Sequence, residues 1–253
     1  MNLSRVLVVP IGMTLLMSCR ALEGQSDELM TEPPSSLEVL SKAGEVYRNL
    51  MTYRDEGVAV THFERTITPF TMERRFTTAF ARSGQFRFEF TESGLVPGLK
   101  HYVVWKHGEE VKSWWTIRPE VERHENLGSA IAGATGVSGG TAYTIPSVLM
   151  QEAAWKGGTW VSSAGSYRIG DGVERGIACF RIQRLTSTQA KTHGGIETPA
   201  SKGKETYWVS KDAFLLLRID SETNFGSFLT TGSVQYFPAI NSPIPETAFE
   251  FGH

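Results

Sequence analysis

The chain has 253 residues, of which 25 are Lys or Arg and 27 are Asp or Glu, so that its formal net charge is −2. Charges of both signs are scattered along it, and no basic stripe is present that would favour nucleic acid. The two cysteines, Cys19 and Cys179, and the six histidines form no group with metal-ligand spacing. We therefore expect one sizeable core with no metal, no cofactor and no nucleic-acid partner.

The first residues have the pattern of an export signal. Arg5 supplies a positive charge, and residues 6–17 form an apolar run. This run is too short to span a bilayer, which needs about 20 apolar residues, but it fits the core of a signal peptide. It ends in Leu16-Met17-Ser18-Cys19, which resembles the lipobox of bacterial lipoproteins, where the chain is cut before a cysteine that then carries acyl chains.

Two interpretations of this N-terminus stay open, a lipidated Cys19 or an ordinary cleaved signal with a chance cysteine. Lipidation of Cys19 is our expectation, and in the resembling lipoproteins a residue such as Arg20 after the cysteine favours delivery to the outer membrane. Residues 20–36 have few apolar side chains, which indicates a flexible tether. The sequence thus predicts a signal peptide over 1–18, a tether over 19–36 and one domain over 37–253.

This domain is expected to begin with an amphipathic helix over residues 35–53. Ser35 and Glu38 have the spacing of a capping box, which satisfies amide donors at a helix start. Apolar residues then follow at steps of three and four and form one stripe: Leu37, Leu40, Ala43, Tyr47, Leu50 and Met51. The polar run at residues 55–57 is expected to end the helix.

After residue 57 the apolar residues recur with a period of two, which is typical of strands. Residues 85–90 show it most clearly, because every second residue is a phenylalanine and the others are polar or charged. One face of such a strand is apolar and the other faces water, as in an antiparallel sheet solvated on one side. The preceding strand, over residues 72–82, has the same alternation. The phenylalanines predicted to share the apolar face are Phe76, Phe80, Phe86, Phe88 and Phe90.

Further strands are expected at hairpin spacing over residues 58–63, 100–106, 111–117, 155–161, 166–169, 176–185, 205–210, 215–222 and 227–237. Because helices are missing between most of them, the pattern favours a curved antiparallel sheet over βαβ units. Short helical or irregular pieces are expected at 127–134 and 146–154. Residues 187–203, rich in Thr, Lys, Gly, Pro and Ser, are expected to form a mobile surface loop.

The order of these parts resembles a known family. The helix ends in "VYRNLMTYRDEG", and a hairpin with "YVVWKHGEEV" presents an aromatic side chain, Trp105. The strands of "GKETYWVSKDAFLLLRID" and the closing "YFPAINSPIPETAFEF" follow. With these segments the chain resembles the LolA/LolB-like superfamily of periplasmic lipoprotein carriers and their relatives, which include RseB-type sensors. The resemblance covers most of residues 36–253.

The resemblance implies an α+β, mainly β fold, in which a curved antiparallel half-barrel is closed by a few helices around an apolar cavity that receives acyl chains. The residues expected to line this cavity are Phe76, Phe80, Phe86, Phe88, Phe90, Trp105 and Trp115. The phenylalanine stripe must be covered, since burying one phenylalanine stabilises a fold by roughly 1.5–3 kcal/mol. Either the first helix covers it as a solid core, or a ligand covers part of it.

Residues 136–140, Gly-Val-Ser-Gly-Gly, fit the G-x-S-x-G turn of serine hydrolases. That turn needs a strand before the serine and a helix after it, whereas Ser138 follows a small, helical or loose stretch and precedes glycines. We therefore expect no catalytic residue, and we place Ser138 in a flexible connection near the cavity mouth. Cys179 lies in an apolar strand-like stretch and is expected to be a buried, inert thiol.

Three functions follow in order of preference. The first is a non-enzymatic cell-envelope lipoprotein that binds lipid or lipoprotein acyl chains. Its N-terminal lipid would anchor it in the outer membrane, facing the periplasm. Lipoprotein sorting is one form of this role. The second is a sensor or scaffold that has a filled core and binds a periplasmic protein. The third is a serine esterase using Ser138. The lipobox favours an anchored receiver or sensor over a soluble shuttle.

Overall fold

The computed structural model describes residues 32–64, 67–93, 100–150, 153, 159–162, 165–193 and 196–251. The chain divides into two compact units, Met1–Pro33 and Pro34–His253, and the second contains all the elements below. This unit has the predicted α+β, mainly β class, because a 12-stranded sheet makes up most of it. All of the paired strands run antiparallel, as the hairpin spacing indicated.

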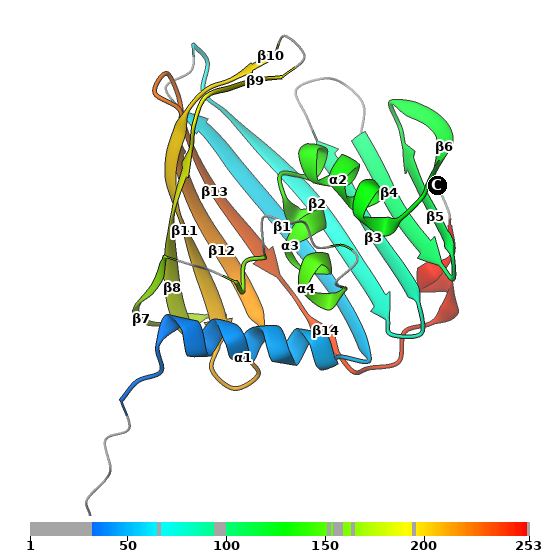
Figure 1. The fold of residues 1–253 in the computed structure, drawn as a ribbon, viewed down its shortest axis with the longest axis horizontal. Coiled ribbons are helices and arrows are strands. Elements are labelled where there is room, and N and C mark those ends of the chain that lie inside the picture. Colours follow the sequence, from blue (N-terminus) through cyan, green and yellow to red (C-terminus); the bar gives the residue numbers. More distant parts are fainter. Residues whose placement is uncertain are drawn as a thin grey trace, which may run out of the picture. The chain divides into compact units, whose positions relative to one another are not determined.

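The strands lie in the order β6-β5-β4-β3-β2-β1-β13-β12-β11-β8-β7, with β14 also paired to β1 (Figure 1). Their bounds are β1 Thr52–Glu64, β2 Phe70–Ala81, β3 Gln85–Ser93, β4 Lys100–His107, β5 Glu110–Trp115, β6 Arg118–His124, β7 Ser166–Glu174, β8 Ile177–Thr188, β11 Ser201–Ser210, β12 Leu216–Asn224, β13 Leu229–Tyr236 and β14 Ala239–Ile240. The sheet is open, with β6 and β7 as the edges of its described part, and it curves around a group of short helices.

The first helix, α1 (Ser36–Asn49), begins with the predicted capping box. Ser35 Oγ accepts a hydrogen bond from Glu38 N at 3.3 Å, and the Glu38 carboxylate accepts one from Ser35 N at 2.7 Å. The helix ends earlier than predicted, because Leu50 has an extended backbone and β1 already begins at Thr52. Its buried side runs along one end of the sheet, where α1 contacts β7 and α4 (Figure 1).

Three further helices, rather than α1, lie over the inner face of β2 to β5 (Figure 1). They are α2 (Leu127–Ser138), α3 (Thr141–Thr144) and α4 (Pro146–Leu149). The predicted helical pieces are therefore confirmed; in the second, α4 ends at Leu149, and residues 151, 152 and 154 lie outside the described part. The Asn126 side chain caps the start of α2, and the chain leaves α2 through Gly139, whose φ of 67° favours glycine.

Several predicted elements differ from the structure. The loop expected at 187–203 is wrong, because β8 continues to Thr188 and a small hairpin follows, made of β9 (Lys191–His193) and β10 (Ile196–Thr198). Of the strand expected at 155–161, residues 155–158 lie outside the described part, and residues 160–161 form a turn. Strand β6 was not predicted, because six of its seven residues are exposed and no apolar alternation marks it.

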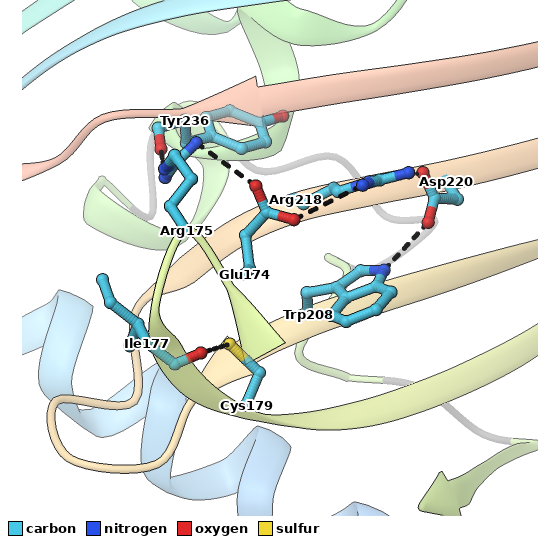
Figure 2. A network of polar contacts seen from close by, with 8 residues as sticks. All are labelled: Glu174, Arg175, Ile177, Cys179, Trp208, Arg218, Asp220 and Tyr236. Carbon is cyan, nitrogen blue, oxygen red and sulfur yellow. Dashed lines mark hydrogen bonds and ion pairs between the residues drawn. The ribbon is translucent and has the colours of Figure 1, made fainter. Parts of the chain in front are cut away.

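A polar network links the turn between β7 and β8 to β11, β12 and β13 of the same sheet (Figure 2). Glu174, which is 6% exposed, lies between two guanidinium groups, 3.6 Å from Arg175 and 3.4 Å from Arg218. Asp220 accepts hydrogen bonds from Arg218 Nε at 2.7 Å and from the Trp208 indole at 2.9 Å. These contacts between the buried Glu174 and partly exposed charged groups join β7 to β11 and β12, which lie far along the chain.

Cys179 lies beside this network and is the one free cysteine of the described residues. Its thiol is buried and donates a weak hydrogen bond to the Ile177 carbonyl at 3.4 Å. Burial raises the pKa of the Cys179 thiol, so that the reactive thiolate is disfavoured. The prediction that Cys179 is buried is confirmed, and the raised pKa agrees with the expectation of an unreactive thiol.

Candidate lipid-binding site

The five predicted phenylalanines share the inner face of the sheet, as the alternation required. Phe76 faces Phe90 and Phe80 faces Phe86 across the β2–β3 ladder. All five side chains are 3% exposed or less, and the Phe88 ring lies 6.2 Å from Phe76 and 6.4 Å from Phe90. In this structure the phenylalanine face is therefore a packed core beneath α2, α3 and α4.

The two tryptophans expected beside them lie on opposite faces of the sheet. Trp115 packs against the core on the inner face, with its ring 5.9 Å from Tyr102. Trp105 is on the outer face, where its indole N–H donates to the Phe249 carbonyl and its ring meets Phe251 at 5.9 Å. Val104 pairs with the inward-facing Phe88 on the neighbouring strand and therefore faces inward as well. Because successive side chains of a strand point to opposite faces, Trp105, the next residue, faces outward.

One end of the phenylalanine face opens into a hollow of about 540 Å³ between the end of α1, the β2–β3 turn and α4. Its apolar wall is formed by Phe80, Phe86, Leu149 and Met150, and its charged rim by Arg48, Arg82 and Lys106. Phe80 and Phe86, two of the predicted cavity residues, are among its lining residues, although their side chains are only 3% and 0% exposed. We call this site the basic hollow.

Arg82 positions the walls of the basic hollow by bonding to the ends of two helices. Its guanidinium donates to the carbonyls of Arg48 at 2.7 Å, Leu50 at 2.9 Å and Leu149 at 2.9 Å. The last carbonyls of a helix have no partner within the helix and carry a partial negative charge. Arg82 therefore both satisfies these carbonyls and holds α1 against α4.

A second hollow, of about 280 Å³, lies between the α2–α3 region and strands β8, β11 and β12. Arg184 and Glu205 form an ion pair at 2.6 Å on its floor, and the Tyr207 hydroxyl donates to the same Glu205 carboxylate. The Trp160 ring stacks on Tyr207 at 5.8 Å. Sequence reasoning missed this site; the signal it offered was a charged residue, Glu205, at an inward position of a strand.

Strand β13 is less covered than the rest of the sheet. Every residue of Leu229–Gln235 in β13 is partly exposed, so neither face of this strand is covered. Its neighbours on the inner face are small, because Gly232 lies between Thr61 of β1 and Ser221 of β12. The face beneath α2, α3 and α4 is thus packed, whereas the side chains on either side of Gly232 are small and carry hydroxyl groups.

A buried carboxyl group lies in the core near α1. Asp55 is 1% exposed, and its Oδ2 accepts a hydrogen bond from the Tyr53 hydroxyl at 2.7 Å. Burial raises the pKa of Asp55 to about 6. Close by, the Tyr47 hydroxyl accepts a hydrogen bond from Leu216 N at 3.1 Å. This cluster holds α1 to β1 and β12.

Ser138 is fully buried at the end of α2, where its Oγ accepts a hydrogen bond from Ala142 N at 3.1 Å. The G-x-S-x-G segment is therefore a helix end, and its serine does not face solvent. A serine and a histidine do meet elsewhere, with Ser113 Oγ 2.8 Å from His124 Nε2. Ser113 is 2% exposed in the middle of β5 and lines neither of the two hollows.

The described helices are too short or too polar for any of them to cross a membrane. Within the same described residues, no three or more His, Cys, Asp or Glu side chains are placed to hold a metal ion.

No protein-family model matches the sequence, and no curated protein matches it. Similar solved structures include LprF from Mycobacterium bovis, with 10% identity, a TM-score of 0.45, and 83% of this chain and 94% of that one covered. The lipoprotein LppX from Mycobacterium tuberculosis has 12% identity and a TM-score of 0.42, over 83% and 97% of the chains. A LolA superfamily protein from Nitrosomonas europaea has 9% identity and a TM-score of 0.33, over 87% and 99%. The last belongs to the superfamily that the sequence resembles, and the likeness concerns the fold alone.

Proposed function

We propose that this chain is a non-enzymatic cell-envelope lipoprotein that binds lipid or the acyl chains of lipoproteins. The observation that carries this proposal is the basic hollow, where the apolar wall of Phe80 and Phe86 meets a rim of basic side chains. An amphiphile has the same two chemistries, an apolar tail and a polar head. The volume of the basic hollow, about 540 Å³, is within the range of small-molecule sites, roughly 300–1,000 Å³.

The tail of such a ligand would lie along the phenylalanine face, in the place that α2, α3 and α4 now occupy. Two features support this route. The helices α3 and α4 have only four residues each. The chain enters them through Gly139 and Gly140, both with positive φ, where glycine tolerates backbone rearrangement. In the occupied state Phe76, Phe88, Phe90 and Trp115 would line the site, and Trp105 would not.

The proposed location rests on the sequence of residues 5–19, which lie outside the described residues. Acylation of Cys19 would anchor the domain in the outer membrane, facing the periplasm, and residues 20–36 would serve as the tether. A role in lipoprotein sorting is the finer form of this proposal. An anchored receiver of acyl chains fits it better than a soluble shuttle, because the anchor restricts the protein to one membrane.

The proposal is tested by extracting and identifying lipids from the purified chain and by native mass spectrometry. Met150→Glu places a carboxylate in the apolar wall of the basic hollow, and we expect it to abolish lipid retention. Met51→Glu is the matched control, because Met51 is 63% exposed and lies outside the hollow. Circular dichroism checks that both variants fold. Absence of lipid from the parent chain, with no binding of a fluorescent fatty acid, would show that the proposal is wrong.

A second candidate is a sensor or scaffold module that binds a periplasmic protein and never admits a ligand. The observation that favours it is the packing of the phenylalanine face, with exposures of 0–3%. Parent protein that carries no lipid but captures a specific envelope protein would support this candidate. The esterase hypothesis would need hydrolysis of a chromogenic ester that is lost in Ser138→Ala, which the burial of Ser138 disfavours.

A further inference from the structure

We propose that the second hollow is a binding site for an uncharged group that has both a hydrogen-bond donor and a hydrogen-bond acceptor, as a carboxamide or an alcohol has. This inference goes beyond the proposed function, because the second hollow and the basic hollow have no lining residue in common. The second hollow has a volume of about 280 Å³, below the roughly 300–1,000 Å³ of sites for drug-sized ligands. We therefore expect it to take a small molecule or one group of a larger ligand.

The lining of the second hollow has polar side chains with exposed surface. Eight of its ten described lining residues are partly exposed, and only Trp160 and Tyr207 are buried. The side chains of Arg184 and Glu205 are 29% and 31% exposed. These two residues are direct partners across the β8–β11 ladder, and Glu205 shares the inner face of β11 with Tyr207. Strand pairing thus fixes the positions of both charged groups at the hollow.

These two charged groups neutralise each other. Arg184 and Glu205 form an ion pair at 2.6 Å, and the Tyr207 hydroxyl donates to the same carboxylate oxygen, Oε2. An anionic ligand would have to compete with Glu205 for the guanidinium, and a cationic ligand would have to compete with Arg184 for the carboxylate. Either exchange leaves one partly buried charge without its partner, which is unfavourable. An uncharged ligand leaves the ion pair intact, and we therefore expect the hollow to prefer it.

Three hydrogen-bonding atoms of the lining residues have no partner in the part of the chain that the structure describes. Two are buried donors without an acceptor, the indole Nε1 of Trp160 and the Nε of Arg184. The third is the acceptor Oε1 of Glu205, since both contacts of this carboxylate end on Oε2. Roughly 90% of buried polar groups in proteins have a partner, because an unsatisfied one destabilises the fold. A ligand that offers an acceptor to these donors and a donor to Glu205 is complementary to this lining.

The test observes the tryptophan indole N–H resonances of the full chain by nitrogen–proton correlation NMR spectroscopy. The chain carries Cys19→Ser, which removes any acyl group from the N-terminus, and the Trp160 resonance is assigned without the use of a variant. The probes are hexanamide and hexan-1-ol, methyl hexanoate, which is only an acceptor, and the ions hexanoate and hexylammonium. We expect hexanamide to shift the Trp160 resonance saturably, because its carbonyl oxygen accepts from the indole N–H. It should bind about tenfold more tightly than methyl hexanoate, which has no donor for Glu205.

One variant and a matched control connect this binding to the hollow. Trp160→Phe removes the indole donor and keeps an aromatic ring against Tyr207, and the affinity for hexanamide, measured by calorimetry, should fall about fivefold. Trp115→Phe is the control, because the Trp115 indole nitrogen is also buried without a partner among the described residues but does not line the second hollow. This control should bind hexanamide as the parent chain does. Circular dichroism checks that both variants fold.

The same titrations contain the results that would overturn the inference. These are the absence of a saturable shift of the Trp160 resonance with both hexanamide and hexan-1-ol, equal binding of methyl hexanoate, tighter binding of either ion at this resonance, and an equal loss of affinity in Trp115→Phe. Tighter binding of hexanamide than of hexan-1-ol supports a carboxamide as the natural group, and the reverse order supports an alcohol. The proposed function is tested separately, by lipid retention and Met150→Glu at the basic hollow, so the two can fail independently.

Discussion

Truncation of Phe88 to alanine measures how completely the inner face is filled. The Phe88 side chain is 0% exposed, and its strand neighbours Thr78 and Val104 flank it on both sides. Because the surrounding helices pack onto it, the removed ring should leave a cavity rather than border existing open space. Phenylalanine-to-alanine changes in packed cores cost about 3–5 kcal/mol, and we expect a loss in this range. For a domain of this size that corresponds to a fall in Tm of about 10 °C.

The assay is equilibrium unfolding in urea, followed by circular dichroism and tryptophan fluorescence. Phe63→Ala is the control, because Phe63 is only partly buried and stacks on Phe70 at 4.4 Å, so about 1–2 kcal/mol is expected. A loss below about 1.5 kcal/mol in Phe88→Ala, similar to the control, would refute the reasoning. It would indicate that the phenylalanine face borders open space in solution and that α2, α3 and α4 leave it easily.

Two further predictions concern the link between α1 and α4 and the anchor at the N-terminus. Arg82→Met removes the hydrogen bonds from one guanidinium to the carbonyls of α1 and α4. Urea unfolding should show a loss of about 2 kcal/mol in the free energy of unfolding, a value already reduced for the exposure of Arg82. A loss below about 0.5 kcal/mol would show that this link contributes little to stability. Cys19→Ser should release the domain into the soluble periplasmic fraction, because stable anchoring needs acyl chains; retention on membranes after a salt wash would contradict the anchor.

The phenylalanine face could be predicted from the sequence because a shift of the strand register by one residue is so unfavourable there. Such a slip would move Arg87 and Glu89 into the core and the phenylalanines to the surface. The same period directs the side chains of Trp105 and its neighbour Val104 to opposite faces of the sheet, so the outward position of Trp105 could be predicted from the local pattern. The family resemblance pointed the other way, and the strand period decides the outcome.

The basic hollow could not be predicted, because its parts meet only in the folded chain. Arg48 ends a helix, Arg82 lies in a hairpin turn and Lys106 lies in a strand, and nothing in their spacing joins them. Each has the sequence context of an ordinary exposed residue. The end of α1 was also hidden from the pattern, since Tyr53 continues the apolar stripe of the helix although it belongs to β1. The hydrogen bond from Tyr53 to Asp55, two residues along the same strand face, and the contact of its ring with Tyr47 of α1 favour the strand there.

Asp55 gives the last prediction, an unusual dependence of stability on pH. Its pKa is raised by burial to about 6, against about 3.9 for an ordinary aspartate. Below pH 4 the group is protonated in both the folded and the unfolded chain and has no effect on their balance. Between pH 4 and pH 6 the unfolded chain loses this proton first, so the folded state becomes less stable as the pH rises. Above pH 6 the full penalty applies, about 3 kcal/mol for a shift of roughly two pH units.

Asp55→Asn removes this penalty because the amide stays neutral at every pH. The free energy of unfolding of the variant, minus that of the parent, should therefore increase by about 2–3 kcal/mol from pH 4 to pH 7. Surface carboxylates whose pKa is lowered by basic neighbours, such as Asp171 beside Lys211 and Arg168, titrate in both proteins and cancel in this difference. Urea unfolding at half-unit pH steps provides the measurement. A difference that stays constant, or that decreases with pH, would mean that Asp55 ionises as it does in water and that the interior near α1 admits solvent.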